Sequence, residues 1–80
     1  MKVEYTSLKR NYQLFQREYE EAILRASRSG WYVLGPELER FEHEFANYIG
    51  VKHCICVNSG TDALILAIRA LGIGEGDEVI

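Results

Sequence analysis

The residues best suited to chemistry lie in one short turn, residues 57–63, which read Val-Asn-Ser-Gly-Thr-Asp-Ala. This turn joins a short apolar run to a strongly helical one. The first amides of a helix have no partners within the helix, and the helix dipole places partial positive charge beside them. A phosphate can therefore bind there through backbone amides and the hydroxyls of Ser59 and Thr61, while Gly60 lets the backbone approach the ligand. The turn is predicted to be an anion site.

A purely structural role for the same hydroxyls stays open. Serine and threonine are common N-cap residues, so Ser59 or Thr61 can cap the following helix without any ligand. The two roles are compatible, because a capped helix start can still hold an anion. Asp62 is left out of the candidate site, since the helix dipole stabilises a carboxylate in the first turn without any chemistry.

Periodic apolar positions predict three helices that would position this turn. The first covers residues 8–29 and ends at a Ser-Gly pair. The second begins at Gly35-Pro36-Glu37, because proline is favoured at the first helical position, and ends at Gly50. The third covers residues 63–71 and is apolar on nearly every side. We expect other parts of a protein to cover it.

Two short segments are predicted to be strands. Residues 53–57 form an apolar run that is too short for a helix, and residues 78–80 begin a second run after a glycine-rich turn. A strand, helix, strand order implies a parallel sheet with helices on both faces. One and a half strands cannot form such a sheet, so we expect residues 1–80 to be the front of a larger α/β protein.

The length and charge of the chain exclude several classes of protein. A chain of 80 residues makes at most one small domain, whose core supplies only about 3 to 5 kcal/mol. A net charge of -3 without a basic tract argues against nucleic-acid and membrane-surface partners. The chain opens with the polar stretch Met-Lys-Val-Glu and has no apolar signal-sequence core there, and no apolar run approaches the roughly 20 residues of a membrane span. We therefore expect a cytoplasmic protein.

The cysteines and histidines do not predict a metal site. Cys54 and Cys56 lie two residues apart on one side of the predicted strand and cannot easily bridge each other. We expect buried free thiols, because two thiols beside His53 without a second Cys or His pair are a weak ligand pattern. His43 lies among charged residues and is expected at the surface.

Four pieces of the sequence resemble the amino-terminal part of the DegT/DnrJ/EryC1/StrS aminotransferases. They are Gly-Trp-Tyr-Val-Leu-Gly-Pro-Glu (30–37), the helix end at 41–53, Asn-Ser-Gly-Thr-Asp-Ala-Leu (58–64) and Leu-Gly-Ile-Gly-Glu-Gly-Asp-Glu-Val-Ile (71–80). Their order and spacing are specific, and they span essentially the whole chain. The resemblance implies an α/β, type I PLP-dependent aminotransferase fold. Residues 1–50 would be a helical lead-in segment, and residues 51–80 the start of the mostly parallel large-domain sheet.

The resemblance also implies a role for the turn. In this family the residues matching Ser59, Gly60 and Thr61 bind the phosphate of pyridoxal 5'-phosphate (PLP). The contacts come chiefly from the main-chain amides of the glycine and the threonine and from the threonine hydroxyl.

A second family segment matches Tyr32, Leu34 and Gly35 and runs near the active-site entrance. An aromatic side chain there can line a nucleotide-sugar pocket. For Tyr32 the alternative is packing between the first two helices. Trp31 is expected in the core or at a subunit interface.

The implied reaction is transfer of an amino group, commonly from glutamate, to a keto-sugar attached to a nucleotide. Such enzymes serve amino-sugar and polysaccharide biosynthesis and usually form homodimers, and the wording of residues 30–37 favours a 3-keto sugar. The chemistry requires a Schiff-base lysine and a carboxylate beside the pyridine nitrogen. Lys2, Lys9 and Lys52 do not fall in the family's lysine context. This segment therefore has no predicted catalytic residue, and the 80-residue chain alone is expected to be inactive.

Three alternatives stay open. The chain can be a non-catalytic truncated product, or part of a PLP-dependent sugar dehydratase of the same family, in which histidine replaces the lysine. It can also belong to another phosphate-binding α/β protein, such as a sugar-phosphate isomerase domain, although residues 30–37 and 76–80 disfavour this. No P-loop is present, and the glycine-rich residues 72–76 follow a helix, so nucleotide hydrolysis and Rossmann-type binding are poorly supported.

Overall fold

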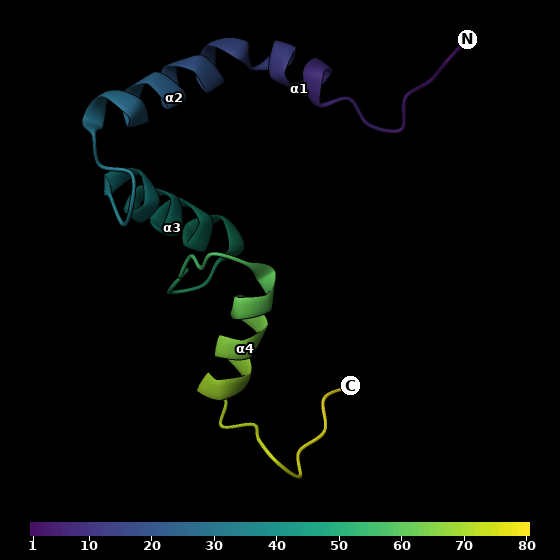
Figure 1. Ribbon diagram of the computed structural model, residues 1–80, viewed down its shortest axis with the longest axis vertical. Helices are drawn as coiled ribbons and strands as arrows, with labels where there is room; N and C mark the ends of the chain where they lie inside the picture. The colour runs from purple at the N-terminus through teal and green to yellow at the C-terminus, as the bar shows by residue number, and fades with distance from the viewer. The chain divides into compact units, whose positions relative to one another are not determined.

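The computed structural model describes residues 1–80, which form four helices and no strand. The chain divides into two units, Met1–Phe41 and Glu42–Ile80. None of the helices combines the length and the apolar run that crossing a bilayer requires. Figure 1 labels the helices in chain order: α1 (Leu8–Leu14), α2 (Gln16–Ser29), α3 (Pro36–Ile49) and α4 (Gly60–Ala70).

The single helix predicted over residues 8–29 is wrong, because the structure breaks it at Phe15 into α1 and α2. Side chains bond across the break: the Tyr12 hydroxyl donates to Glu20 at 2.5 Å, and the Tyr19 hydroxyl donates to Asn11 at 2.9 Å. Each pair is eight residues apart, which is about 12 Å along a straight helix. The bend at Phe15 lets these pairs meet.

The second predicted helix is confirmed. α3 begins at Pro36, where the missing amide proton costs nothing, and its first turn carries Glu37, which the helix dipole favours. Arg25 of α2 bonds Glu37 at 2.6 Å, and this guanidinium lowers the pKa of the Glu37 carboxyl. After α3, Gly50 takes the left-handed conformation (φ 83°), as predicted for a helix-ending glycine.

The third predicted helix exists but starts earlier than residue 63, at Gly60. Its end is a Schellman motif, in which the Gly72 amide donates to the carbonyl of Arg69 at 3.0 Å and the Ile73 amide to that of Ile68 at 3.1 Å. Gly72 has φ 71°, which explains the glycine at this position. The next turn is closed by Asp77, whose carboxylate accepts the Gly74 amide at 2.8 Å.

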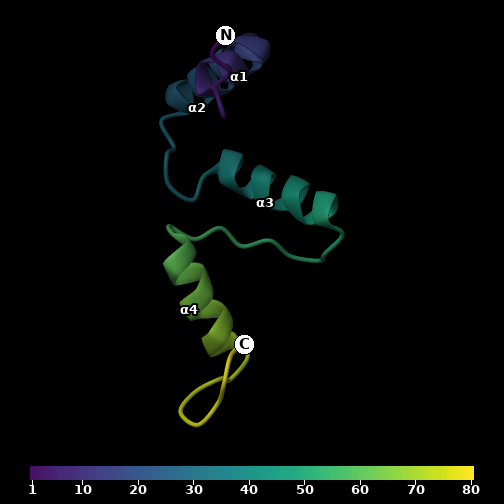
Figure 2. The same ribbon diagram turned by 90° about the vertical axis from the view of Figure 1, so that its right-hand side faces the viewer.

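The predicted strands at residues 53–57 and 78–80 are not formed in the structure. Figure 2 shows the segment between α3 and α4 running back beneath α3, with no strand beside it. A strand is defined by hydrogen bonds to a neighbouring strand, and residues 1–80 supply no such neighbour. The expected start of a parallel sheet is therefore absent from the chain as it stands.

Very little of the chain is buried. Gly35 and Ala46 are the only buried residues, and no residue of α4 is buried. The accessible surface is 8108 Å², whereas a compact domain of 9.2 kDa exposes about 4,900 Å². The expectation that other protein must cover the apolar α4 agrees with this exposure.

Candidate functional site

The start of α4 has the geometry of a capped helix with two free amides. The Ser59 backbone is extended, and its side-chain oxygen accepts the Asp62 amide at 3.2 Å. The Ser59 carbonyl accepts the Ala63 amide at 3.0 Å, which is the first bond of the helix. The amides of Gly60 and Thr61 precede that bond and have no carbonyl partner within the helix. They are the donors that an anion would meet.

The capping role of Ser59 does not use up its hydroxyl. A hydroxyl accepts through its lone pairs and keeps one hydrogen to donate, so Ser59 can cap Asp62 and donate to an anion at once. Thr61 is exposed at the same turn and carries a second hydroxyl. Both readings of Ser59 that the sequence left open are thus compatible with one geometry, and binding by Ser59, Gly60 and Thr61 stays a prediction.

The structure gives no internal reason for a glycine at position 60. Gly60 does not have a positive φ, and a Cβ added to it would meet no atom within 4 Å. The side of the turn where that Cβ would stand is therefore open. A ligand or a covering segment that approaches this side would meet backbone and not a side chain.

The loop before α3 is closely built around Trp31. The Trp31 indole donates to the Val33 carbonyl at 2.8 Å. A Cβ on Gly35 would lie 2.9 Å from the Trp31 carbonyl oxygen and 3.1 Å from its ring, so only glycine fits. Between them, Leu34 has φ 50°, a left-handed conformation that is uncommon for a residue with a side chain. These contacts and the φ of Leu34 set the shape of the loop in the structure.

The two aromatic side chains of this loop, Tyr32 and Trp31, are exposed and are not part of a buried core. The Tyr32 hydroxyl donates to the Ser27 carbonyl of α2 at 2.8 Å, while its ring stays exposed. Trp31 is 60% exposed, so it does not lie in a core formed by this chain. Its expected alternative, a subunit interface, stays a prediction.

The predicted site residues fall into two separate groups. Tyr32, Leu34 and Gly35 lie in one loop of the first unit, and Ser59, Gly60 and Thr61 lie in one turn of the second. Within each group the members are neighbours in the chain, and the structure leaves each group accessible apart from the buried Gly35.

One contact near the turn was missed by the sequence analysis. A side-chain oxygen of Glu42 in α3 accepts the amide of Cys56 at 2.7 Å. Glu42 is half-buried and stands at helical spacing from the apolar residues Leu38, Phe45 and Ile49 of α3. A carboxylate among apolar residues on one face of a helix indicates a hydrogen-bonding partner at that face, because carboxylates are almost never buried unpaired.

The cysteines are free and half-buried. Burial raises the pKa of the Cys56 thiol, and the neighbouring Cys54 and Glu42 raise this pKa further. The groups around Cys56 thus favour the neutral thiol, which is the less reactive form. No group of three His, Cys, Asp or Glu side chains is arranged to hold a metal ion.

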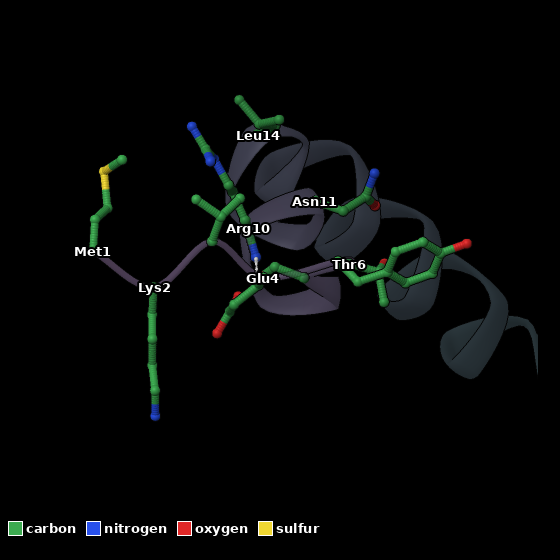
Figure 3. Close-up of a pocket in the computed structure, with 10 residues that line it drawn as sticks. Met1, Lys2, Glu4, Thr6, Arg10, Asn11 and Leu14 are labelled. Atoms are coloured by element: carbon green, nitrogen blue, oxygen red, sulfur yellow. Dashed lines mark hydrogen bonds between the residues drawn. The ribbon is translucent and has the colours of Figure 1, made fainter.

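Hollows also lie outside the turn itself, and two of them bear on the candidate site and on the amino-terminal tail. The first, of about 440 Å³, is lined by apolar residues of the 53–57 segment and of α4: Ile55, Val57, Ala63, Leu66, Ala67 and Ala70. The second, of about 680 Å³, lies between the amino-terminal tail and α1 (Figure 3), where Arg10 donates its amide to the Ser7 cap. Its walls include the fully exposed Met1 and Tyr5, so it is an open surface without a built site.

Comparison with known proteins identifies the family. Residues 13–80 match the DegT/DnrJ/EryC1/StrS aminotransferase family. The chain belongs to this family. The resemblance found in the sequence is therefore confirmed, and membership implies the type I PLP fold for the family, of which these residues show four helices.

Several curated relatives are similar over most of the chain. A dTDP-3-amino-3,4,6-trideoxy-alpha-D-glucose transaminase of Streptomyces venezuelae is 54% identical over 79 residues, which are 99% of this chain and 21% of the relative. A dTDP-3-amino-3,6-dideoxy-alpha-D-galactopyranose transaminase of Aneurinibacillus thermoaerophilus is 54% identical over 66 residues, 82% of this chain and 18% of the relative. A UDP-2-acetamido-2-deoxy-3-oxo-D-glucuronate aminotransferase of Pseudomonas aeruginosa is 41% identical over 78 residues, 98% and 22% respectively.

The chain spans about a fifth of the length of these relatives, and it corresponds to their amino-terminal portion. No solved structure matches it.

Proposed function

We propose that residues 1–80 are the amino-terminal portion of a PLP-dependent aminotransferase that acts on a nucleotide-linked keto-sugar, with glutamate as amino donor. The observation that carries the proposal is the family match over residues 13–80. The relatives named above are nucleotide-sugar aminotransferases, which supports the same substrate class. The intact enzyme is proposed to be a homodimer.

The start of α4 fits the phosphate of PLP. It offers the free amides of Gly60 and Thr61, the hydroxyl of Thr61 and the unused hydrogen of Ser59, all at the positive end of a helix dipole. The open side of Gly60 leaves room for an anion to approach the backbone. These three residues are the proposed phosphate-binding group.

The role of this segment in the reaction is binding and orientation. When bound, PLP supplies the electron sink that transamination requires. Ser59, Gly60 and Thr61 would hold its phosphate, so that the reactive end keeps a fixed place relative to the rest of the enzyme. No side chain of residues 1–80 is proposed to transfer a proton.

A 3-keto sugar is the proposed acceptor. Two of the relatives carry a 3-amino sugar in their names, and the third carries a 3-oxo sugar. We propose that the loop bearing Tyr32, Leu34 and Gly35 lines the sugar-nucleotide pocket. The exposed Tyr32 ring and the exposed Leu34 side chain are available for such contacts.

A chimera tests the proposed function directly. Residues 1–80 replace the corresponding amino-terminal portion of the Streptomyces venezuelae transaminase, to which they are 54% identical. The chimera is expected to bind PLP, measured by the visible absorbance of the cofactor, and to transfer an amino group from glutamate to the 3-keto sugar nucleotide. A chimera with native-like circular dichroism that binds no PLP would contradict the proposal.

Gly35→Ala tests the shape of the Trp31 loop in the same chimera. The added Cβ would crowd the Trp31 carbonyl, and overpacking of this kind costs about 1 to 3 kcal/mol. Urea unfolding is expected to show that loss. Gly74→Ala is the matched control, because its added Cβ meets no atom of this chain within 4 Å. Equal stability of the two variants would show that the loop can accommodate a side chain at position 35.

A further inference from the structure

Glu42 joins α3 to the segment that leads into the phosphate turn. Its carboxylate accepts the Cys56 amide at 2.7 Å, and both residues are half-buried. The bond joins residues 14 apart in the chain. By contrast, the caps and turns of this unit, at Gly50, Gly72 and Gly74, are held by bonds that span three to five residues.

This bond lies close in the sequence to the phosphate turn, so it can affect the position of that turn. Cys56 lies only three residues before Ser59, which caps α4. A hydrogen bond that holds the Cys56 amide therefore limits how far Ser59 and the following amides of Gly60 and Thr61 can move.

The surroundings of Cys56 support a specific contact. The Glu42 carboxylate bonds the Cys56 amide and also contributes to the raised pKa of the Cys56 thiol, after burial and Cys54. One carboxylate thus lies beside both the backbone and the side chain of the same residue. A hydrogen bond to a charged acceptor in a half-buried place is stronger than one between neutral groups in water.

We infer that Glu42 is a positioning residue for the phosphate turn, which fixes the 53–57 segment through the Cys56 amide and so presents the Gly60 and Thr61 amides to PLP. This inference rests on the proposed function. It assigns to an α3 carboxylate a role that neither the family match nor the relatives' names contain. Glu42 touches neither cofactor nor substrate in this scheme.

The test uses the chimera described above and three variants. Glu42→Ala removes the acceptor. Glu42→Gln removes the charge but keeps a carbonyl oxygen that can accept the Cys56 amide. Glu39→Ala is the matched control, since Glu39 is an exposed carboxylate one turn earlier on the same helix. For each protein we measure the PLP dissociation constant and the hydrogen exchange rate of the Cys56 amide.

Glu42→Ala is expected to weaken PLP binding about tenfold, the effect of one lost hydrogen bond to a charged group, and to speed exchange of the Cys56 amide. Glu42→Gln is expected to keep both values within about threefold of the parent, because the neutral acceptor retains part of the bond. Glu39→Ala is expected to change neither value. A purely structural role would lower the melting temperature and leave the PLP dissociation constant of the folded protein unchanged.

Three results would overturn the inference: unchanged PLP binding in Glu42→Ala, equal damage by Gln and Ala, or slow Cys56 exchange in Glu42→Ala. Failure of the proposed function is distinguishable from these. A parent chimera that binds no PLP rejects the proposed function, and the inferred presentation of the amides to PLP falls with it. Cys56 exchange in the same chimera still reports whether Glu42 holds the segment.

Discussion

Thr61→Val in the chimera is expected to raise the dissociation constant for PLP roughly 10- to 100-fold. The substitution deletes one hydroxyl that would donate to the phosphate, and a hydrogen bond to a charged group is worth roughly 1.5 to 3 kcal/mol. Valine has nearly the same shape and is also β-branched, so the helix start keeps its conformation. The amides of Gly60 and Thr61 are untouched. Titration of the apoprotein with PLP, followed by absorbance, measures the effect.

Two further variants make this result specific. Thr61→Ser restores a hydroxyl and is expected to bind PLP within a few-fold of the parent. Thr6→Val makes the same chemical change in the exposed amino-terminal tail, far from the turn in the chain, and is expected to have no effect. If Thr61→Val binds PLP as tightly as the parent, the assignment of Thr61 to the phosphate is wrong.

The 80-residue chain alone is expected to show no cooperative unfolding and no aminotransferase activity. Its 8108 Å² of accessible surface lies about two-fifths of the way from the roughly 4,900 Å² of a compact domain to the roughly 13,000 Å² of an unfolded chain of this mass. The exposed surface includes α4, where Leu64 is 67% and Leu66 51% accessible. Burial of this kind is too small to offset the conformational entropy that folding removes.

Thermal denaturation followed by circular dichroism tests this expectation. A broad, gradual loss of helix is expected for the isolated chain, whereas the chimera should unfold in one sharp transition. Treatment of the isolated chain with PLP and borohydride is expected to label no single lysine, because Lys2, Lys9 and Lys52 lie outside the family's lysine context. A sharp transition, or a defined adduct at one of these lysines, would reject the prediction.

Local signals predicted the helix ends well. Pro36 marked the start of α3, and Gly50 and Gly72 adopt the left-handed conformations that end helices. These features depend on the φ preferences of single residues and on bonds within a few positions, which the sequence carries directly. The N-cap at Ser59 belongs to the same class.

The errors concern features that need a distant partner. The break at Phe15 occurs without proline or glycine, and it accompanies side-chain bonds such as that of Tyr12 to Glu20, eight positions apart. The strand over residues 53–57 was predicted from its apolar composition, but strand hydrogen bonds need a neighbour that residues 1–80 do not provide. The apolar composition of a segment indicates that the segment tends to be buried, but it does not identify the strand with which the segment would pair.

The phosphate turn shows where the two kinds of information divide. The order Ser59, Gly60, Thr61 before an apolar helix is enough to specify a capped start with two free amides, because every bond involved is local. The hydrogen bond from the Cys56 amide to Glu42 cannot be predicted from neighbouring residues. The two partners are 14 residues apart and meet only when the segment after α3 folds back against that helix. Neighbouring residues determine short-range backbone geometry, whereas contacts between residues far apart in the chain depend on how the elements pack.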